Sequence, residues 1–213
     1  MFPLKDDIPT RRRPVVTVAL LLANVGVYLF QHAAYPTFQA SIFSLGVTPR
    51  EVVTGVDSWP PSLLPPVATL LTSMFSHGGL AHIGSNMLFL WIFGNNVEDD
   101  MGRFKFLLFY LLCGLGAAGA QILVAPSSEI PMVGASGAIA GVLGAYLLLY
   151  PHARVLALVP IFFFLQLIWV PAVIFLALWF VLQVLGGFAT AGAAGGGVAY
   201  AAHVGGFVIG VLL

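Results

Sequence analysis

Residues 133–150 read VGASGAIAGVLGAYLLLY, a run of 18 residues without a charged side chain, in which Ser136 is set among glycine and alanine. A helix that crosses a bilayer needs about 20 mostly apolar residues, so this run approaches the required length. Five further stretches are similarly apolar and carry no charge in their interiors: 15–32, 67–94, 104–124, 170–187 and 195–213. We therefore predict an all-α, polytopic membrane protein whose residues 1–213 form a single domain of six transmembrane helices.

The composition of the whole chain supports the same class. Of its 213 residues, 60% are hydrophobic and 8% are charged, against about 25% charged residues in an average soluble domain. Eight Lys and Arg balance eight Asp and Glu, so the chain lacks the basic charge of a nucleic-acid-binding protein. Cys113 is the single cysteine, which excludes an internal disulfide and a cysteine-rich metal cluster. Membrane lipids are the expected surroundings, and no nucleic-acid partner is expected.

The distribution of basic residues predicts the orientation in the membrane. Seven of the eight Lys and Arg residues fall on one side of an alternating six-span path, and only Arg50 falls on the other. Basic residues concentrate in cytoplasmic loops, so we expect both termini to be cytoplasmic. The first stretch follows three arginines, as in a signal peptide, but its apolar run is longer than a signal core and no convincing cleavage site follows. Because Leu213 is still apolar, we expect chain beyond it.

Two segments between the stretches are more than simple linkers. The outer loop 33–66 mixes prolines and polar residues with apolar side chains, and we predict that it lies in the membrane interface with Trp59 at the headgroups. The segment Val155–Trp169 is apolar but contains Pro160. It forms either one interrupted span or an interfacial piece before the fifth helix, and we favour the second interpretation.

Polar side chains inside three of the six stretches indicate a functional site. His82 and Asn86 are four residues apart and share a helix face, while Ser136 and His203 occur in the fourth and sixth stretches. These three stretches run in the same direction, so the four side chains fall at similar depth in the outer half of the membrane. Each alone has a structural explanation, such as a serine bonded to its own helix or a histidine that packs or relays protons. Together they supply a hydroxyl, a base and spare donors, which acyl transfer requires.

Glycines next to the serine and the histidine predict that their helices touch. Gly137-x-x-x-Gly141 and Gly206-x-x-x-Gly210 begin just after these two residues. Small residues at this spacing let two helix backbones approach closely, which would bring the two side chains within hydrogen-bonding distance. No Asp or Glu lies within the six stretches. The sequence therefore predicts a pair of serine and histidine without a third, carboxylate member.

Three motifs, in order along the chain, resemble those of the rhomboid intramembrane serine proteases, in particular bacterial members. They are H-x-x-x-N from His82 to Asn86, GASG around Ser136 and AHVGG around His203. The resemblance covers essentially the whole chain and implies a rhomboid-like six-helix bundle. It implies that Ser136 is the nucleophile and His203 the general base. It also implies an oxyanion hole formed by the Ser136 backbone N–H, His82 and Asn86, with Gly134 keeping the site open.

The same resemblance implies a serine endopeptidase without cofactor or metal. Its substrates would be single-span membrane proteins, cleaved in their transmembrane segments near the outer end. The implied location is a bacterial inner membrane, in which the protein passes several times. One position departs from the pattern, because Ala140 stands where other members have a tyrosine whose ring packs on the catalytic histidine.

Three other interpretations fit parts of the pattern. The polar residues could line the path of a transporter or channel, although the six stretches contain no carboxylate and show no inverted repeat. The chain could be an inactive rhomboid-like protein that binds membrane clients, but such relatives lack the serine or the histidine. His77, beside two glycines at the outer membrane boundary, could join His82 and His203 around a metal, but no carboxylate or thiolate accompanies them.

Overall fold

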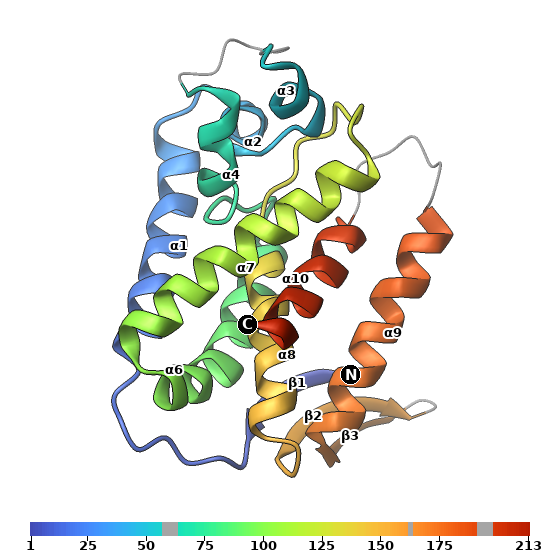
Figure 1. Cartoon of the computed structure of the whole chain (residues 1–213). Coiled ribbons are helices and arrows are strands. Elements are labelled where there is room, and N and C mark those ends of the chain that lie inside the picture. The colour runs from blue at the N-terminus through green and yellow to red at the C-terminus, as the bar shows by residue number, and fades with distance from the viewer. Residues whose placement is uncertain (57–63, 162–163, 191–197) are drawn as a thin grey trace.

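The computed structural model describes residues 1–56, 64–161, 164–190 and 198–213. Trp59, which we predict at the membrane headgroups, lies outside the described residues. Most of the described chain is helical, and a three-stranded sheet lies at one end (Figure 1). The elements in chain order are β1 Phe2–Asp6, α1 Val15–Ala33, α2 Phe38–Leu45, α3 Pro49–Thr54, η1 Pro66–Ala68, α4 Thr69–Thr72, α5 Leu80–Phe89, η2 Leu90–Gly94, α6 Asn95–Met101, α7 Arg103–Val124, α8 Ser136–Leu149, β2 Arg154–Ile161, β3 Phe164–Pro171, α9 Ala172–Thr190 and α10 Tyr200–Leu212.

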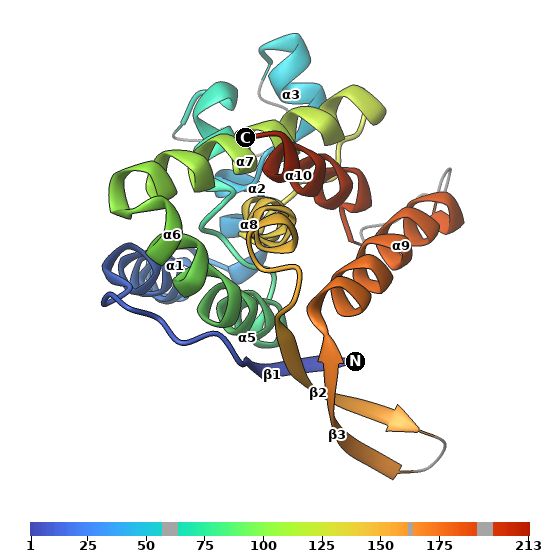
Figure 2. The same cartoon turned by 60° about the horizontal axis from the view of Figure 1, so that its bottom comes forward.

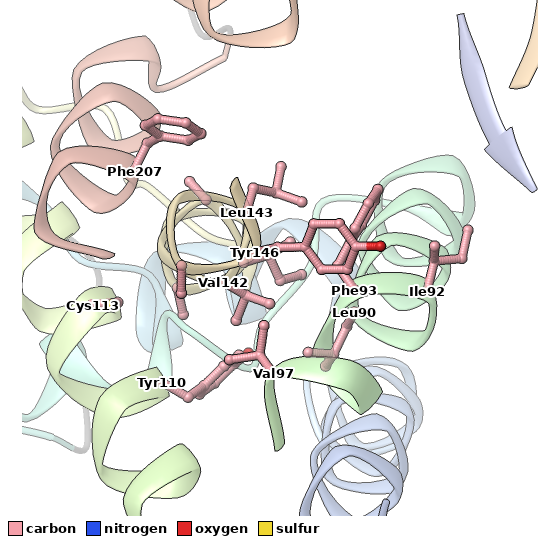
Figure 3. Close-up of a cluster of buried hydrophobic side chains, with 14 of the residues drawn as sticks. Leu90, Ile92, Phe93, Val97, Tyr110, Cys113, Val142, Leu143, Tyr146 and Phe207 are labelled. Carbon is pink, nitrogen blue, oxygen red and sulfur yellow. The ribbon is translucent and has the colours of Figure 1, made fainter. Parts of the chain in front are cut away.

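Helix α8 lies at the centre of the molecule, in contact with α5, α7, α9 and α10 (Figure 2). Every residue from Gly137 to Tyr146 is buried. A helix that is apolar on all sides is buried either in a protein core or in a membrane, and α8, which has no charged residue, is buried by its neighbours. On one side, the ring of Tyr146 meets Phe93 of η2 edge to face, with a centroid distance of 5.0 Å (Figure 3). The fold therefore surrounds the helix that begins with the predicted nucleophile.

Five of the six predicted spans each contain one helix of the described chain, namely α1, α7, α8, α9 and α10. Among the described residues, three helices are long and apolar enough to cross a membrane: Val15–Ala33, Arg103–Val124 and Ala172–Ala189. The apolar helices α8 and α10 correspond to the fourth and sixth predicted spans but are shorter. The protein is thus mostly helical, with three candidate membrane spans in the part of the chain that the structure describes.

The predicted span 67–94 is wrong in its first half. There the chain forms a 3-10 turn (η1), the four-residue helix α4 and a turn, and the long helix begins only at Leu80. Residues 73–79 are not helical, and Gly79 fixes the start of α5, because its φ of 152° is one that residues with a Cβ rarely adopt. From Leu80 the helical path continues through α5, a π-helical turn (η2) and α6 to Met101.

The predicted close approach of two helices is confirmed for α8 and α10. A Cβ added to Gly206 would overlap the carbonyl oxygen of Gly137, and one added to Gly210 would overlap that of Gly141. Any larger residue at Gly206 or Gly210 would push the two backbones apart. These glycines therefore set the distance between the helices that carry the serine and the histidine.

The all-α prediction holds for most of the described chain but not for the described residues of Val155–Trp169, which belong to two strands. β2 and β3 form an antiparallel hairpin, and β1 pairs with the other edge of β2. The segment contains β-branched and aromatic residues, which suit a pleated structure. Pro160 fits within β2 because the pairing with β1 ends at Leu158, so β2 has only one neighbouring strand beyond that point. The interrupted-span interpretation is therefore wrong, and the position of this hairpin in the membrane interface stays a prediction.

Acidic residues of α6 hold the N-terminal segment in place. Glu98 accepts hydrogen bonds from the backbone N–H groups of Val16 and Thr17, at 2.9 and 2.7 Å. Asp99 accepts a hydrogen bond from the backbone of Arg11 at 2.8 Å and forms an ion pair with its side chain. A carboxylate stabilises the N-terminus of a helix, so Glu98 caps α1. Glu98 and Asp99 thus attach the segment before α1 and the first turn of α1 to α6.

The basic residues used to predict orientation gather at that same end. β1, β2 and the first residues of α1 and α7 all lie there, whereas α3, which carries Arg50, lies at the opposite end (Figure 1). The arrangement matches an alternating path. The positive-inside rule then assigns the end with the sheet to the cytoplasm, which stays a prediction.

The outer loop packs on the segment that leads into α8. Val47 and Met132 pair through their backbones, with N···O distances of 2.9 Å in both directions. The backbone N–H of Arg50 donates to the carbonyl of Ser128 at 3.0 Å, and the Arg50 side chain forms an ion pair with Glu129. These contacts fix the approach to Ser136. That this loop lies in the membrane interface stays a prediction.

Candidate active site

Two neighbouring helices bring Ser136 and His203 together. Ser136 is the first residue of α8, and His203 lies in the first turn of α10. Both helices begin at the same end of the bundle (Figure 1). The hydroxyl oxygen of Ser136 lies 2.7 Å from Nε2 of His203, which is a hydrogen-bonding distance. The serine and the histidine expected at similar depth are in direct contact.

The other ring nitrogen of His203 has a partner that the sequence analysis missed. Nδ1 lies 2.8 Å from Oε1 of Gln183, which α9 contributes. A polar residue inside an apolar span is a signal of function, and Gln183 stands in the uncharged stretch 170–187. The prediction considered only carboxylates as a third member, so it passed over this amide.

Trp179 packs on His203, as the resemblance implies that a tyrosine does in the family members that lack an alanine at the position of Ala140. The two ring centroids are 5.9 Å apart, with an angle of 34° between the planes. Ala140, at the position of that tyrosine, is buried in α8. An aromatic residue of α9 therefore covers the histidine, and the tyrosine is not needed for this contact.

His82 and Gly134 face each other beside the serine. The backbone N–H of Gly78 donates to Nδ1 of His82 at 3.2 Å, so in the neutral ring the proton resides on Nε2. A Cβ added to Gly134 would lie 2.7 Å from that Nε2 and 3.5 Å from Oγ of Ser136. Gly134 also has a φ of 127°, which favours glycine. The missing side chain at Gly134 thus leaves room for the Nε2 edge of the His82 ring beside the serine.

Asn86 lies one helical turn beyond His82 on α5. Its side-chain nitrogen donates to the carbonyl oxygen of His82 at 2.9 Å, and the residue is only 5% exposed. An amide nitrogen has two N–H donors, so this bond leaves one for another acceptor. The shared helix face predicted from the spacing is confirmed, because both side chains line the same cavity.

This cavity has a volume of about 1640 Å³. Its lining includes the five predicted site residues together with Gln183: Ser136, His203, His82, Asn86, Gly134 and Gln183. Further lining residues belong to α2 and to the segment before α8, at the end of the bundle where α8 and α10 begin. The polar side chains therefore surround one space that is large enough for an extended peptide segment and water.

His77 lies next to this group but is held by other contacts. It is fully buried, and its Nδ1 lies 3.2 Å from the carbonyl oxygen of Phe75. Its ring meets that of His82 at a centroid distance of 5.2 Å. Among the described residues, no group of three or more His, Cys, Asp or Glu side chains is arranged to hold a metal ion. The alternative in which His77, His82 and His203 share a metal gains no support from this geometry.

Comparison with known proteins identifies the family. Residues 64–213 match the model of the Rhomboid domain. The chain is 32% identical over 137 residues to Rhomboid-like protein 11, chloroplastic, of Arabidopsis thaliana, which covers 64% of this chain and 43% of that relative. It is 33% identical over 149 residues to Rhomboid protein 1, mitochondrial, of Saccharomyces cerevisiae, which covers 68% of this chain and 40% of the relative.

A bacterial relative shows higher identity over a shorter region. Rhomboid protease GluP of Bacillus subtilis is 45% identical over 78 residues, which are 37% of this chain and 15% of the relative. The chain spans less than half the length of each of these three relatives. The domain match nevertheless covers well over half of the present chain, from the turn before α4 to the last residue. The protein belongs to the rhomboid family.

Proposed function

We propose that this protein is an intramembrane serine endopeptidase that cleaves transmembrane segments of single-span membrane proteins near their outer ends. The observation that carries the proposal is the 2.7 Å distance between Oγ of Ser136 and Nε2 of His203, inside a cavity with further polar groups. The name of the Bacillus subtilis relative, a rhomboid protease, supports the same activity.

In the proposed reaction, Ser136 attacks the scissile carbonyl while Nε2 of His203 takes up the hydroxyl proton. A tetrahedral oxyanion forms, and His203 then delivers the proton to the departing amine. Water attacks the resulting acyl-enzyme with His203 again as the base. Neither a cofactor nor a metal takes part in these steps.

Three donors would stabilise the oxyanion. Ser136 is the first residue of α8, so its backbone N–H is one of the four that an α-helix leaves without an intrahelical acceptor. The N-terminus of α8 also carries a partial positive charge that favours an anion. His82 contributes its Nε2–H and Asn86 its second amide N–H. Gly134 keeps the space between these donors and the serine free.

The length of α8 bears on where the reaction takes place. Its 14 residues span roughly 21 Å at a rise of about 1.5 Å per residue, which is less than the ~30 Å of a bilayer core. If α8 crosses from the cytoplasmic side, Ser136 lies below the outer surface, and the cavity provides the path for water. We propose six spans in total, with the N-terminus cytoplasmic and the path through α5, η2 and α6 serving as the second span.

The substrate must expose a peptide bond to this site. A transmembrane helix satisfies its backbone groups internally, so the cleaved segment has to unwind first. We therefore propose substrates with helix-destabilising residues near the outer end and small side chains before the scissile bond. The relatives include chloroplastic and mitochondrial proteins; for this chain we propose a bacterial inner membrane.

Cleavage of a single-span reporter by the purified protein in liposomes tests this function. We expect Ser136→Ala to lower the rate by more than about 1,000-fold, because no other hydroxyl replaces the nucleophile. Ser127→Ala, at an exposed loop serine, is the matched control and should cleave like the wild type. Cleavage by Ser136→Ala at the wild-type rate would refute the proposed function.

A further inference from the structure

Gln183 connects α9 to the proposed base. The carbonyl oxygen of its amide lies 2.8 Å from Nδ1 of His203. That His203 nitrogen points away from Ser136, which is bound by Nε2 at 2.7 Å. The imidazole is therefore held at both nitrogens, by α8 on one side and by α9 on the other.

The orientation of the amide determines which group donates. The nitrogen of the Gln183 amide donates to the backbone carbonyl of Trp179 at 3.3 Å. The amide oxygen therefore faces His203, and since a carbonyl oxygen only accepts, Nδ1 of His203 must carry the proton. In the neutral ring this leaves the lone pair on Nε2, facing the hydroxyl of Ser136. The ring of Trp179, 5.9 Å from that of His203, restricts the remaining freedom of the imidazole.

A neutral histidine has two tautomers, and only one of them accepts a proton from the serine. The group bonded to the other nitrogen decides between them. In soluble serine proteases a buried carboxylate provides this bond, whereas no Asp or Glu lies in the predicted spans here. An amide oxygen offers the same acceptor without a charge, which is costly within a membrane.

We propose that Gln183 is a positioning residue that fixes His203 in the tautomer with the proton on Nδ1, and that it makes the serine–histidine pair a triad of Ser136, His203 and Gln183. Gln183 contacts His203 and not Ser136, so the role that we assign to it is exerted through His203. The inference rests on the proposed function, because it assigns His203 the part of the general base.

Two substitutions at Gln183 test the inference in the full-length protein in detergent micelles. Gln183→Met keeps the length and flexibility of the side chain but removes the acceptor, and Gln183→Glu restores an acceptor oxygen. Leu182→Met is the matched control, because it places the same new side chain on the neighbouring, exposed position of α9. The kcat and KM of reporter cleavage and the thermal midpoint are measured for each variant.

We expect Gln183→Met to lower kcat by about 10- to 100-fold, at or below the low end of what general acid–base catalysis contributes. KM and the thermal midpoint should stay near the wild-type values, Gln183→Glu should recover most of the activity, and Leu182→Met should match the wild type. The ¹⁵N NMR signals of the His203 ring, assigned by their loss in His203→Ala, should show the Nδ1–H form in the wild type. They should shift toward the Nε2–H form in Gln183→Met.

The outcomes separate the inference from the function on which it rests. A wild-type kcat for Gln183→Met, or an unchanged Nδ1–H signal, would overturn the role of Gln183 while Ser136→Ala remains inactive. A fall in thermal midpoint together with KM, without a change of tautomer, would assign Gln183 a purely structural part and overturn the inference as well. Cleavage by Ser136→Ala would instead refute the proposed function.

Discussion

Substitution of Gly134 by alanine tests the geometry of the oxyanion hole most sharply. The new Cβ would lie 2.7 Å from Nε2 and 2.9 Å from Cε1 of His82, whereas non-bonded atoms pack at about 3.5–4.0 Å. The His82 ring must therefore retreat by about 1 Å, which moves its N–H away from the oxyanion. Loss of one such donor costs about 2.7–4 kcal/mol, equivalent to roughly 100- to 1,000-fold in kcat.

The same substitution also strains the backbone. The φ of 127° at Gly134 is unfavourable for alanine, and holding a residue in such a region costs about 1–3 kcal/mol. We expect a modest fall in stability and a much larger fall in kcat. Gly84→Ala, in α5 with nothing within 4 Å of the added Cβ, should retain activity and gain about 0.5–1 kcal/mol in stability.

The assay is cleavage of a single-span reporter in liposomes, with kcat and KM determined separately and the free energy of unfolding followed in parallel. We expect Gly134→Ala to lower kcat far more than its lost stability accounts for. A variant that is destabilised but turns over like the wild type would refute it. In that case His82 would not stabilise the oxyanion, and Gly134 would serve only the turn before α8.

Three further predictions concern other groups. His203→Ala should lose activity as completely as Ser136→Ala, and chelators should leave the wild type unaffected; activity lost with chelator and restored by zinc would contradict this. Asn86→Ala should lower kcat by roughly 100-fold with little change in KM, the low end for an oxyanion donor, whereas normal turnover with a lower thermal midpoint would make Asn86 structural. Burial raises the pKa of Asp6, which accepts a 2.6 Å hydrogen bond from Tyr146. The contribution of Asp6 to the free energy of unfolding is thus greatest below its pKa in the unfolded chain, about 3.8, and declines as the pH rises through its higher pKa in the folded protein. Asp6→Asn should therefore unfold at a higher temperature than the wild type at pH 8 and lose this advantage near pH 4, and a pH-independent difference would contradict it.

The parts of the fold that could be predicted from the sequence rest on strong and simple signals. An apolar run such as Arg103–Val124 has no alternative to a buried or membrane-spanning helix. The glycine pairs of α8 and α10 correctly predicted that these two helices touch, because only the absence of a Cβ permits the backbones to approach so closely. The spacing of His82 and Asn86 placed both on one helix face for a geometric reason that tertiary structure does not change.

The errors arose where several structures satisfy the same pattern. Val155–Trp169 is apolar, and hydrophobicity alone does not distinguish a buried helix from a short hairpin. In the predicted span 67–94, the apolar residues on both sides concealed the break over residues 73–79, although Ser, His and two glycines stand there. Gln183 was visible as a polar residue in an apolar stretch but was missed because only carboxylates were considered as a third member. Its contact with His203 depends on the position of α9 relative to α10, which neither segment encodes by itself.

The most direct test of the central claim is to locate the residue that reacts with a serine-directed fluorophosphonate. We expect a single covalent adduct, identified by mass spectrometry on Ser136, and loss of cleavage in proportion to labelling. His203→Ala, shown to be folded by its thermal midpoint, should give no adduct, because the hydroxyl lacks its base. An adduct on another residue, or a protein that cleaves its substrate while Ser136 stays unmodified, would contradict the account.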